Sequence, residues 1–180
     1  SRFVIKDGIL MFQSPKKICV IGMGYIGLPT AAVMANSGLK VHGVDIAHDV
    51  IQTVSSGKIH IVEPGLEALV KTAIEKNNLT VSMQVRLADA YIIAVPTPLV
   101  NGNKPDLSHV YEAVGAIASC LEKNNLVVLE STSPVGTTEE VSRHLSKLRP
   151  DLNFPHNHPQ GSDIAIAYCP ERVLPGRILR

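Results

Sequence analysis

The chain has 180 residues, 45% of them hydrophobic, which is enough to bury one good core and leaves no room for two full domains, so a single domain with a tail is expected. Its 17 basic and 16 acidic residues include no basic block, which argues against nucleic acid or an anionic membrane as the partner and favours a small ligand. No segment approaches 18 consecutive apolar residues, and the first twelve residues lack the apolar stretch and cleavage site of a signal peptide.

Residues 1–16 are expected to form an extension, with Met11 as a candidate native start, and residues 17–180 the folded domain. The cysteines are odd in number and lie in or beside apolar segments, which indicates reduced thiols in a cytoplasmic protein; they are Cys19, Cys120 and Cys169.

The first elements of the domain predict a complete βαβ unit. An apolar run over 17–21 predicts a buried strand, and it leads directly into a glycine turn over 22–27. Good helix formers over 28–37 predict a helix, with Gly38 as its left-handed cap. A second strand over 41–44 then reaches Asp45, at the spacing where a dinucleotide-binding unit places the acid for its ribose.

Each residue of this turn has a physical task. Gly22 permits the tight turn, Gly24 lets a pyrophosphate approach the backbone, and Gly27 lets the helix pack closely on the strand. The N–H groups and the positive helix end would then face the phosphates. Asp45 would accept hydrogen bonds from the ribose hydroxyls and repel a 2′-phosphate, so NAD is predicted in preference to NADP.

The following segments continue the alternation of strand and helix. Helices are predicted over 48–56 and from Pro64 through 74, and strands over 79–83 and 90–95. Because the last strand is apolar throughout, it should be covered on both faces. The predicted fold class is therefore α/β: a Rossmann-type, doubly wound, mainly parallel sheet with helices on both faces.

The strand over 90–95 ends at Pro96-Thr97-Pro98, where Thr97 could touch a cofactor or lie in a solvated, proline-stiffened turn. Residues 101–105 read as a loop, and Asp106 can cap a helix that runs to Leu121. His109 and Cys120 fit the surface and core of that helix better than a metal site.

A strand over 126–130 precedes the hydroxyl-rich turn over 131–136. Thr137 and Glu140 have the spacing of a capping box for the next helix, which ends at Arg149-Pro150. Thr132 could hold the nicotinamide ribose, a substrate oxygen or a water, or it could be a turn hydroxyl satisfied within the protein.

Residues 151–163 read as a polar loop. His156 and His158 lack further ligands, so a solvated loop is preferred to a metal site and no metal is predicted. A final strand over 164–168 places Glu171 and Arg172 just beyond its end, where they could handle a proton and an anionic group or form a surface salt bridge.

The chain resembles the amino-terminal domain of the UDP-glucose/GDP-mannose dehydrogenase family. The motifs that carry the resemblance follow one another over nearly all of the domain, at 20–29, 59–66, 94–98, 130–136 and 168–176. The first is common to many dinucleotide-binding proteins, whereas Glu-Ser-Thr-Ser-Pro-Val-Gly at 130–136 and the segment at 168–176 are more specific. Arg172-Val173 stands where relatives for UDP-glucose carry an aromatic-leucine pair, which favours the subgroup acting on UDP-N-acetyl-D-mannosamine.

The resemblance implies two successive NAD-dependent oxidations that turn the C6 hydroxymethyl of a nucleotide sugar into a carboxylate, in polysaccharide biosynthesis. Glu171 would serve in hydrolysis of a thioester intermediate, with Thr132 positioning water, and Arg172 and Val173 would contact the sugar nucleotide. The NAD site would be lined by a set from four strand ends: Tyr25, Ile26, Asp45, Thr97 and Thr132.

The chain departs from the family in its missing nucleophile. The cysteine that forms the thioester, and the lysine and asparagine that handle the oxyanion, belong to central and carboxyl-terminal parts that this sequence does not contain, and Cys19, Cys120 and Cys169 do not replace the cysteine. The chain is thus expected to bind NAD without turning over, and the full-length protein to be a homodimer. The alternatives are a UDP-glucose 6-dehydrogenase, a β-hydroxyacid dehydrogenase relative and a non-catalytic NAD-binding module. The second would want an NADP-binding arginine at the position where this chain has Asp45.

Overall fold

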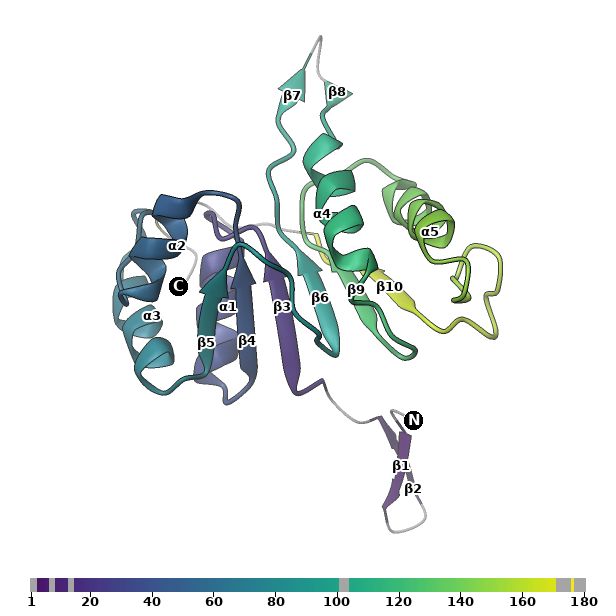
Figure 1. Cartoon of the computed structure of the whole chain (residues 1–180), viewed down its shortest axis with the longest axis horizontal. Helices are drawn as coiled ribbons and strands as arrows, with labels where there is room; N and C mark the ends of the chain where they lie inside the picture. Colours follow the sequence, from purple (N-terminus) through teal and green to yellow (C-terminus); the bar gives the residue numbers. More distant parts are fainter. Residues whose placement is uncertain (1–2, 7–8, 13–14, 101–103, 171–175, 177–180) are drawn as a thin grey trace.

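A computed structural model describes residues 3–6, 9–12, 15–100, 104–170 and 176. Its centre is a six-stranded sheet in which every neighbouring pair is parallel, in the order β10-β9-β6-β3-β4-β5 (Figure 1). The strands are β3 (Lys17–Ile21), β4 (Lys40–Val44), β5 (Leu79–Ser82), β6 (Ala90–Ile93), β9 (Leu126–Leu129) and β10 (Ala165–Tyr168).

Helices cover both faces of the sheet, which confirms the predicted fold class. They are α1 (Gly27–Asn36), α2 (His48–Ser55), α3 (Leu66–Glu75), α4 (Ser108–Ala118) and α5 (Thr137–Leu148). Helices α1 and α3 share a core with the side chains of one face, among them Val20 and Ile92. On the other face, α4 and α5 pack against Cys19 and Tyr91. The alternation of neighbouring strand residues between the two cores follows from the two-residue period of a strand.

The direction in which successive strands are added to the sheet reverses between β3 and β6. The chain goes outward from β3 through β4 to β5, returns to the middle at β6, and goes outward again to β9 and β10. The register aligns the carboxyl ends, since Ile21 pairs with both Val44 and Ile93, and Ile93 pairs with Leu129. In open sheets of this kind, ligands bind beyond the carboxyl ends at the point of reversal.

Two local predictions were wrong. Thr137 and Glu140 do not form a capping box, because Gly136, with φ of +96°, is the N-cap residue and no side chain caps the helix. The Thr137 hydroxyl instead donates to the Pro134 carbonyl at 2.8 Å, and Glu140 accepts a hydrogen bond from the Tyr111 hydroxyl at 2.7 Å. Part of the predicted loop over 101–105 belongs to a small antiparallel pair, β7 (Leu99–Val100) with β8 (Lys104–Pro105).

The segment over 151–163 is less solvated than its composition indicates. Leu152 and Phe154 are buried in the core beside α5, and His156 Nδ1 lies 2.7 Å from the Ser142 hydroxyl. Asp106 is not the N-cap residue of α4 as predicted, because Leu107 occupies that position without a side-chain cap, although Asp106 Oδ1 accepts the N–H of Ser108, the first residue of the helix, at 2.9 Å.

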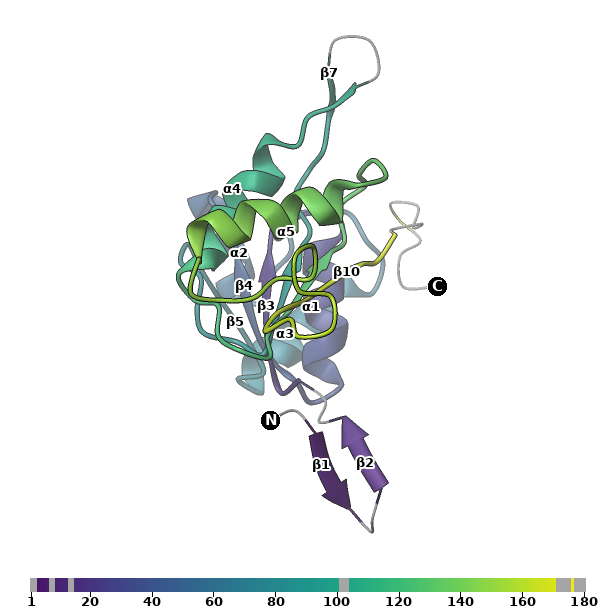
Figure 2. The same cartoon turned by 90° about the vertical axis from the view of Figure 1, so that its right-hand side faces the viewer.

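Within the predicted extension, β1 (Phe3–Lys6) and β2 (Ile9–Phe12) form an antiparallel hairpin. The two views place it away from the sheet, beyond the amino end of β3 (Figure 1, Figure 2).

Candidate functional site

The glycine turn lies where β3 ends and α1 begins, and its backbone is fitted closely to the neighbouring strands. Gly22 has φ of +92° and donates its N–H to the Val44 carbonyl at 2.8 Å. A β-carbon at Gly27 would lie 1.8 Å from the Gly22 carbonyl oxygen, so only glycine fits there. At Gly24, by contrast, a β-carbon would meet nothing within 4 Å, so space is open beside the backbone at the position predicted to face a pyrophosphate.

The turn also offers hydrogen-bond donors. Among the described residues, the N–H groups of Gly24, Tyr25 and Ile26 have no acceptor, whereas that of Leu28 donates to the Gly24 carbonyl. Helix α1 has no acidic residue of its own in its first turn, so the helix sequence adds no negative charge at the positive end of the helix dipole. Both features suit an anion.

Asp45 follows β4 and holds the glycine turn in place. Its Oδ2 accepts the N–H of Met23 at 2.8 Å and its Oδ1 accepts the N–H of Ala47 at 2.9 Å. A carboxylate has about four acceptor positions, so capacity remains for hydroxyl donors of a ligand. The carboxylate therefore fixes the shape of the turn as well as placing a negative charge next to it.

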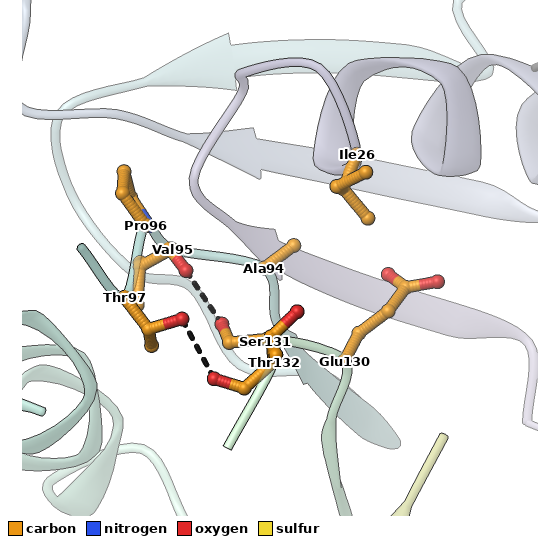
Figure 3. Close-up of a pocket in the computed structure, with 8 residues that line it drawn as sticks. All are labelled: Ile26, Ala94, Val95, Pro96, Thr97, Glu130, Ser131 and Thr132. Carbon is orange, nitrogen blue, oxygen red and sulfur yellow. Dashed lines mark hydrogen bonds between the residues drawn. The ribbon is translucent and has the colours of Figure 1, made fainter. Parts of the chain in front are cut away.

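A cavity of about 270 Å³ adjoins the turn at the point where the order of strand addition reverses (Figure 3). Its walls come from the start of α1, the end of β6 and the end of β9, and the lining residues are Ile26, Ala94, Val95, Pro96, Thr97, Glu130, Ser131 and Thr132. Three of the predicted site residues, Ile26, Thr97 and Thr132, therefore meet at one place. Tyr25 is 45% exposed and does not line this cavity.

Two hydrogen bonds join the strand ends that form the cavity floor, both drawn in Figure 3. The Thr97 hydroxyl donates to the Thr132 carbonyl oxygen at 2.6 Å, and the buried Ser131 hydroxyl donates to the Val95 carbonyl oxygen at 2.6 Å. Thr97 is therefore not a purely solvated turn residue. The Thr132 side chain is exposed and its hydroxyl forms no hydrogen bond with another described residue, so this hydroxyl is available at the cavity.

Glu130 is a cavity residue that the sequence analysis did not single out. It is half-buried, and its Oε1 accepts a hydrogen bond from the Thr30 hydroxyl at 3.2 Å, which joins the end of β9 to the first turn of α1. The signal was its place as the first residue after β9, at the carboxyl edge of the sheet.

Glu171, Arg172 and Val173 lie outside the described residues, so their predicted roles stay predictions. The next described position, Gly176, donates its N–H to Oε2 of the buried Glu63 at 2.7 Å. Gly176 therefore contacts the loop that precedes α3.

The cysteines differ in environment. Cys19 is buried, and this burial raises the pKa of its thiol to about 11, so it stays protonated near neutral pH. Cys120 is half-buried and Cys169 is exposed, and all three are free thiols.

Within the described part of the chain, no group of three or more His, Cys, Asp or Glu side chains is placed to hold a metal ion. No helix in that part has the length and apolar character to cross a membrane.

Taken together, the geometry fits a dinucleotide. An anion can approach the open backbone at Gly24, Asp45 lies beside the turn at the end of β4, and the cavity between Ile26 and Thr132 continues along the sheet edge from the turn. Hydroxyl and carboxylate groups at that cavity can orient a polar ring and its ribose.

Comparison with known sequences agrees with this geometry. A sequence model described as the UDP-glucose/GDP-mannose dehydrogenase family, NAD binding domain, matches residues 16–180. A UDP-N-acetyl-D-mannosamine dehydrogenase of Campylobacter jejuni is 53% identical over 165 residues, which are 91% of this chain and 40% of that protein. An NDP-N-acetyl-D-galactosaminuronic acid dehydrogenase of Ralstonia nicotianae is 52% identical over 165 residues, which are 92% of this chain and 39% of the relative.

Solved structures give the same result. The UDP-N-acetyl-mannosamine dehydrogenase of Staphylococcus aureus superposes with a TM-score of 0.82 at 38% identity, covering 91% of this chain and 38% of that one. A GDP-mannose dehydrogenase ternary complex from Pseudomonas aeruginosa superposes with a TM-score of 0.80 at 26% identity, covering 88% of this chain and 37% of that one. The chain therefore spans about 40% of the length of the curated relatives that it matches.

Proposed function

Since the chain belongs to the UDP-glucose/GDP-mannose dehydrogenase family, as its NAD-binding domain, we propose that the whole protein oxidises UDP-N-acetyl-D-mannosamine to UDP-N-acetyl-D-mannosaminuronate in two NAD-dependent steps. Residues 17–180 form the cofactor domain, and residues 1–16 stand outside it. The observation that carries the proposal is the glycine turn, where open space beside Gly24 adjoins a cavity lined by Thr97 and Thr132.

In this proposal, NAD accepts the hydride and the residues of this chain hold and orient it. The N–H groups of Gly24, Tyr25 and Ile26 face the pyrophosphate, with Gly22 and Gly27 shaping the turn, and Asp45 accepts hydrogen bonds from the ribose hydroxyls. Thr97 keeps the main chain at Thr132 in position through its 2.6 Å hydrogen bond.

The substrate roles rest on the family resemblance. Thr132 positions a water at the cavity, Glu171 serves in the hydrolysis of the enzyme-bound intermediate, and Arg172 and Val173 contact the sugar nucleotide. The nucleophilic cysteine comes from a part of the protein beyond Arg180, so this chain binds NAD but does not reduce it. The whole protein is a homodimer in the cytoplasm, a location supported by the three free thiols.

A second candidate substrate is supported by the comparisons. The Ralstonia relative named for N-acetyl-D-galactosaminuronic acid is as similar to this chain as the Campylobacter one, so identity does not separate the two sugars. Both names imply the same reaction class for those relatives, and turnover of the full-length gene product with each UDP-sugar distinguishes the candidates.

Calorimetric titration of the chain with NAD and with NADP tests the cofactor site. NAD should bind more tightly than NADP, and Gly24→Val should abolish binding of both because its side chain fills the space beside the turn. Asp45→Asn should narrow the affinity difference between NAD and NADP, whereas Asp49→Asn, which removes an exposed carboxylate in the first turn of α2, should leave it unchanged. Equal affinities of the wild-type chain for NAD and NADP would contradict the role of Asp45.

The catalytic part of the proposal needs the full-length gene product. There, Thr132→Ala should lower kcat while the affinity for NAD changes little, and Thr132→Ser should restore the rate by returning a hydroxyl. Steady formation of NADH by the 180-residue chain with a UDP-sugar would overturn the expectation that the nucleophile lies elsewhere.

A further inference from the structure

A second cavity, of about 260 Å³, lies at the opposite edge of the sheet from the proposed cofactor site. It is formed by the amino ends of β3, β4 and β5 and by the segment that connects β5 to β6. Figure 1 shows this segment passing in front of β4 and β3, and the Gln84 carbonyl lies 3.0 Å from His42 Nε2 on β4. The lining residues are Lys17, Ile18, Lys40, Val41, His42, Asn77, Asn78, Thr80, Arg86 and Leu87.

Three of these residues are cationic and none is acidic: Lys17, Lys40 and Arg86. Among the ion pairs of the described residues, none involves these three side chains. Lys40 Nζ is held by two neutral acceptors, the Asn77 carbonyl at 3.1 Å and Asn78 Oδ1 at 2.8 Å, so its position is fixed while its charge is not compensated. The side chains that line the cavity therefore carry three formal positive charges, all on exposed residues, and no negative one.

Two nearby residues bear on this charge, the acidic Asp89 and the titratable His42. The carboxylate of Asp89 accepts the main-chain N–H groups of Lys16 and Lys17 at 2.8 and 2.9 Å, but Asp89 does not line the cavity. His42 is buried, and burial lowers the pKa of its imidazole, with the charge of Arg86 acting in the same direction. Its ring nitrogens are occupied by Thr80, Ser82 and Gln84, so it is a neutral wall of the cavity at pH 7.

The remaining lining is apolar. Ile18 and Val41 also border the cavity, but each is only 3% exposed and belongs to the core shared with α1 and α3, so the apolar side chain that a ligand can reach is Leu87, which is 62% exposed. An exposed leucine next to three uncompensated cations favours a ligand that is both anionic and partly apolar, because each part of the lining then finds a matching surface. Arginine and lysine together are the usual partners of a phosphate group.

We propose that this cavity, lined by Lys17, Lys40 and Arg86, binds an organic phosphate monoester up to the size of a mononucleotide, with the phosphate at the cations and the organic part against Leu87. The site is separate from the carboxyl edge of the sheet, so a ligand here can bind together with the dinucleotide.

Phenyl phosphate is a suitable probe because it combines a phosphate with a compact apolar body and is not a fragment of a dinucleotide or a nucleotide sugar. It is titrated into the isotope-labelled 180-residue chain in the presence of excess NAD, and amide chemical shifts are followed. The expected shifts are at Lys40, Thr80 and Arg86. Inorganic phosphate should give the same shifts at lower affinity, and phenol should give none. The readout does not depend on whether NAD itself binds.

The double variant Lys40→Met with Arg86→Met should weaken binding of phenyl phosphate by at least about tenfold, since each charged hydrogen bond contributes that much or more. Lys58→Met, an exposed lysine away from the cavity, is the matched control and should bind like the wild type. If the double variant fails to fold, added sodium chloride should weaken binding to the wild-type chain instead. Shifts confined to the Gly24 and Thr97 region, affinity unchanged in the double variant or insensitive to salt, or equal shifts with phenol would each overturn the proposal.

Discussion

At the level of single residues, two glycines of the same turn have opposite tasks. The absent side chain of Gly27 lets α1 meet β3, since a β-carbon there would lie 1.8 Å from a backbone oxygen. The absent side chain of Gly24 leaves space that the protein itself does not fill. We therefore expect Gly27 to be needed for packing and Gly24 for the binding of a ligand.

Paired substitutions separate these tasks. Gly27→Ala should lower the free energy of unfolding by about 1–3 kcal/mol or more, because the backbone must shift to admit the methyl group. Gly24→Ala should change stability by less than about 1 kcal/mol and weaken NAD binding instead. Urea unfolding and calorimetric titration measure the two quantities. Equal losses of stability in the two variants would contradict this division.

Two buried groups that ionise at alkaline pH, the Cys19 thiol and the Tyr91 hydroxyl, predict how the free energy of unfolding changes as pH rises. Burial raises the pKa of Cys19 from 9.0 to about 11 and that of Tyr91 from 10.0 to about 12. Below pH 9 both groups are protonated whether the chain is folded or unfolded. Between the unfolded and the folded pKa of each group, the unfolded chain releases its proton and the folded chain keeps it, so the free energy of unfolding falls as pH rises.

The free energy of unfolding should therefore decline above pH 9, with a limiting slope of about 1.4 kcal/mol per pH unit for each group. Cys19→Ala removes one of the two groups. Its stability should be lower at pH 8 because of the lost packing, but its decline towards pH 11 should be shallower than that of the wild type. Urea unfolding at a series of pH values compares the slopes, and parallel curves would show that Cys19 does not contribute.

At the level of elements, the start of α5 shows where local pattern is insufficient. Thr137 and Glu140 have capping-box spacing, yet the left-handed Gly136 lets the chain enter the helix without a side-chain cap. Both polar side chains find other partners, Pro134 and Tyr111, one of which lies on a different helix. The spacing of residues along the chain does not show which other groups will bind these two side chains in the folded protein.

A glycine before α5 and a glycine within α4 provide a matched test of these backbone conformations. Gly136→Ala should lower stability by about 1–2 kcal/mol, because a left-handed conformation costs a side chain that much. Gly115→Ala lies within α4, on an exposed position where a β-carbon meets nothing within 4 Å, and should raise stability by about 0.5–1 kcal/mol. Thermal unfolding measures both, and destabilisation by Gly115→Ala would contradict the assigned helix interior.

The strands were largely predictable because each is a short apolar run bounded by turn residues, and the glycine turn identified the first of them. The cavity was predictable in part. Thr97 and Thr132 follow strands, so their meeting at one edge follows from parallel pairing. Glu130 did not stand out, because its contact with Thr30 joins residues 100 positions apart and depends on the packing of α1 against β9. The cavity at the amino ends of the strands has no sequence signature, since its three cations come from separate segments.

At the level of the whole molecule, one sheet separates two apolar cores. Leu66 of α3 is fully buried in one core and Leu145 of α5 in the other. The central strands contribute alternate side chains to both cores, so loss of either core leaves the sheet with an uncovered apolar face. The two cores should therefore unfold together.

Leu66→Ala and Leu145→Ala test this coupling. Each should lower the free energy of unfolding by about 2–5 kcal/mol, the usual cost of a buried leucine. Each should also retain a single transition in which circular dichroism and tyrosine fluorescence coincide. The denaturant dependence of that free energy should match the wild type, because the same surface becomes exposed. A biphasic transition in either variant, with one set of helices persisting after the other has melted, would mean that the two faces of the sheet are separate folding units.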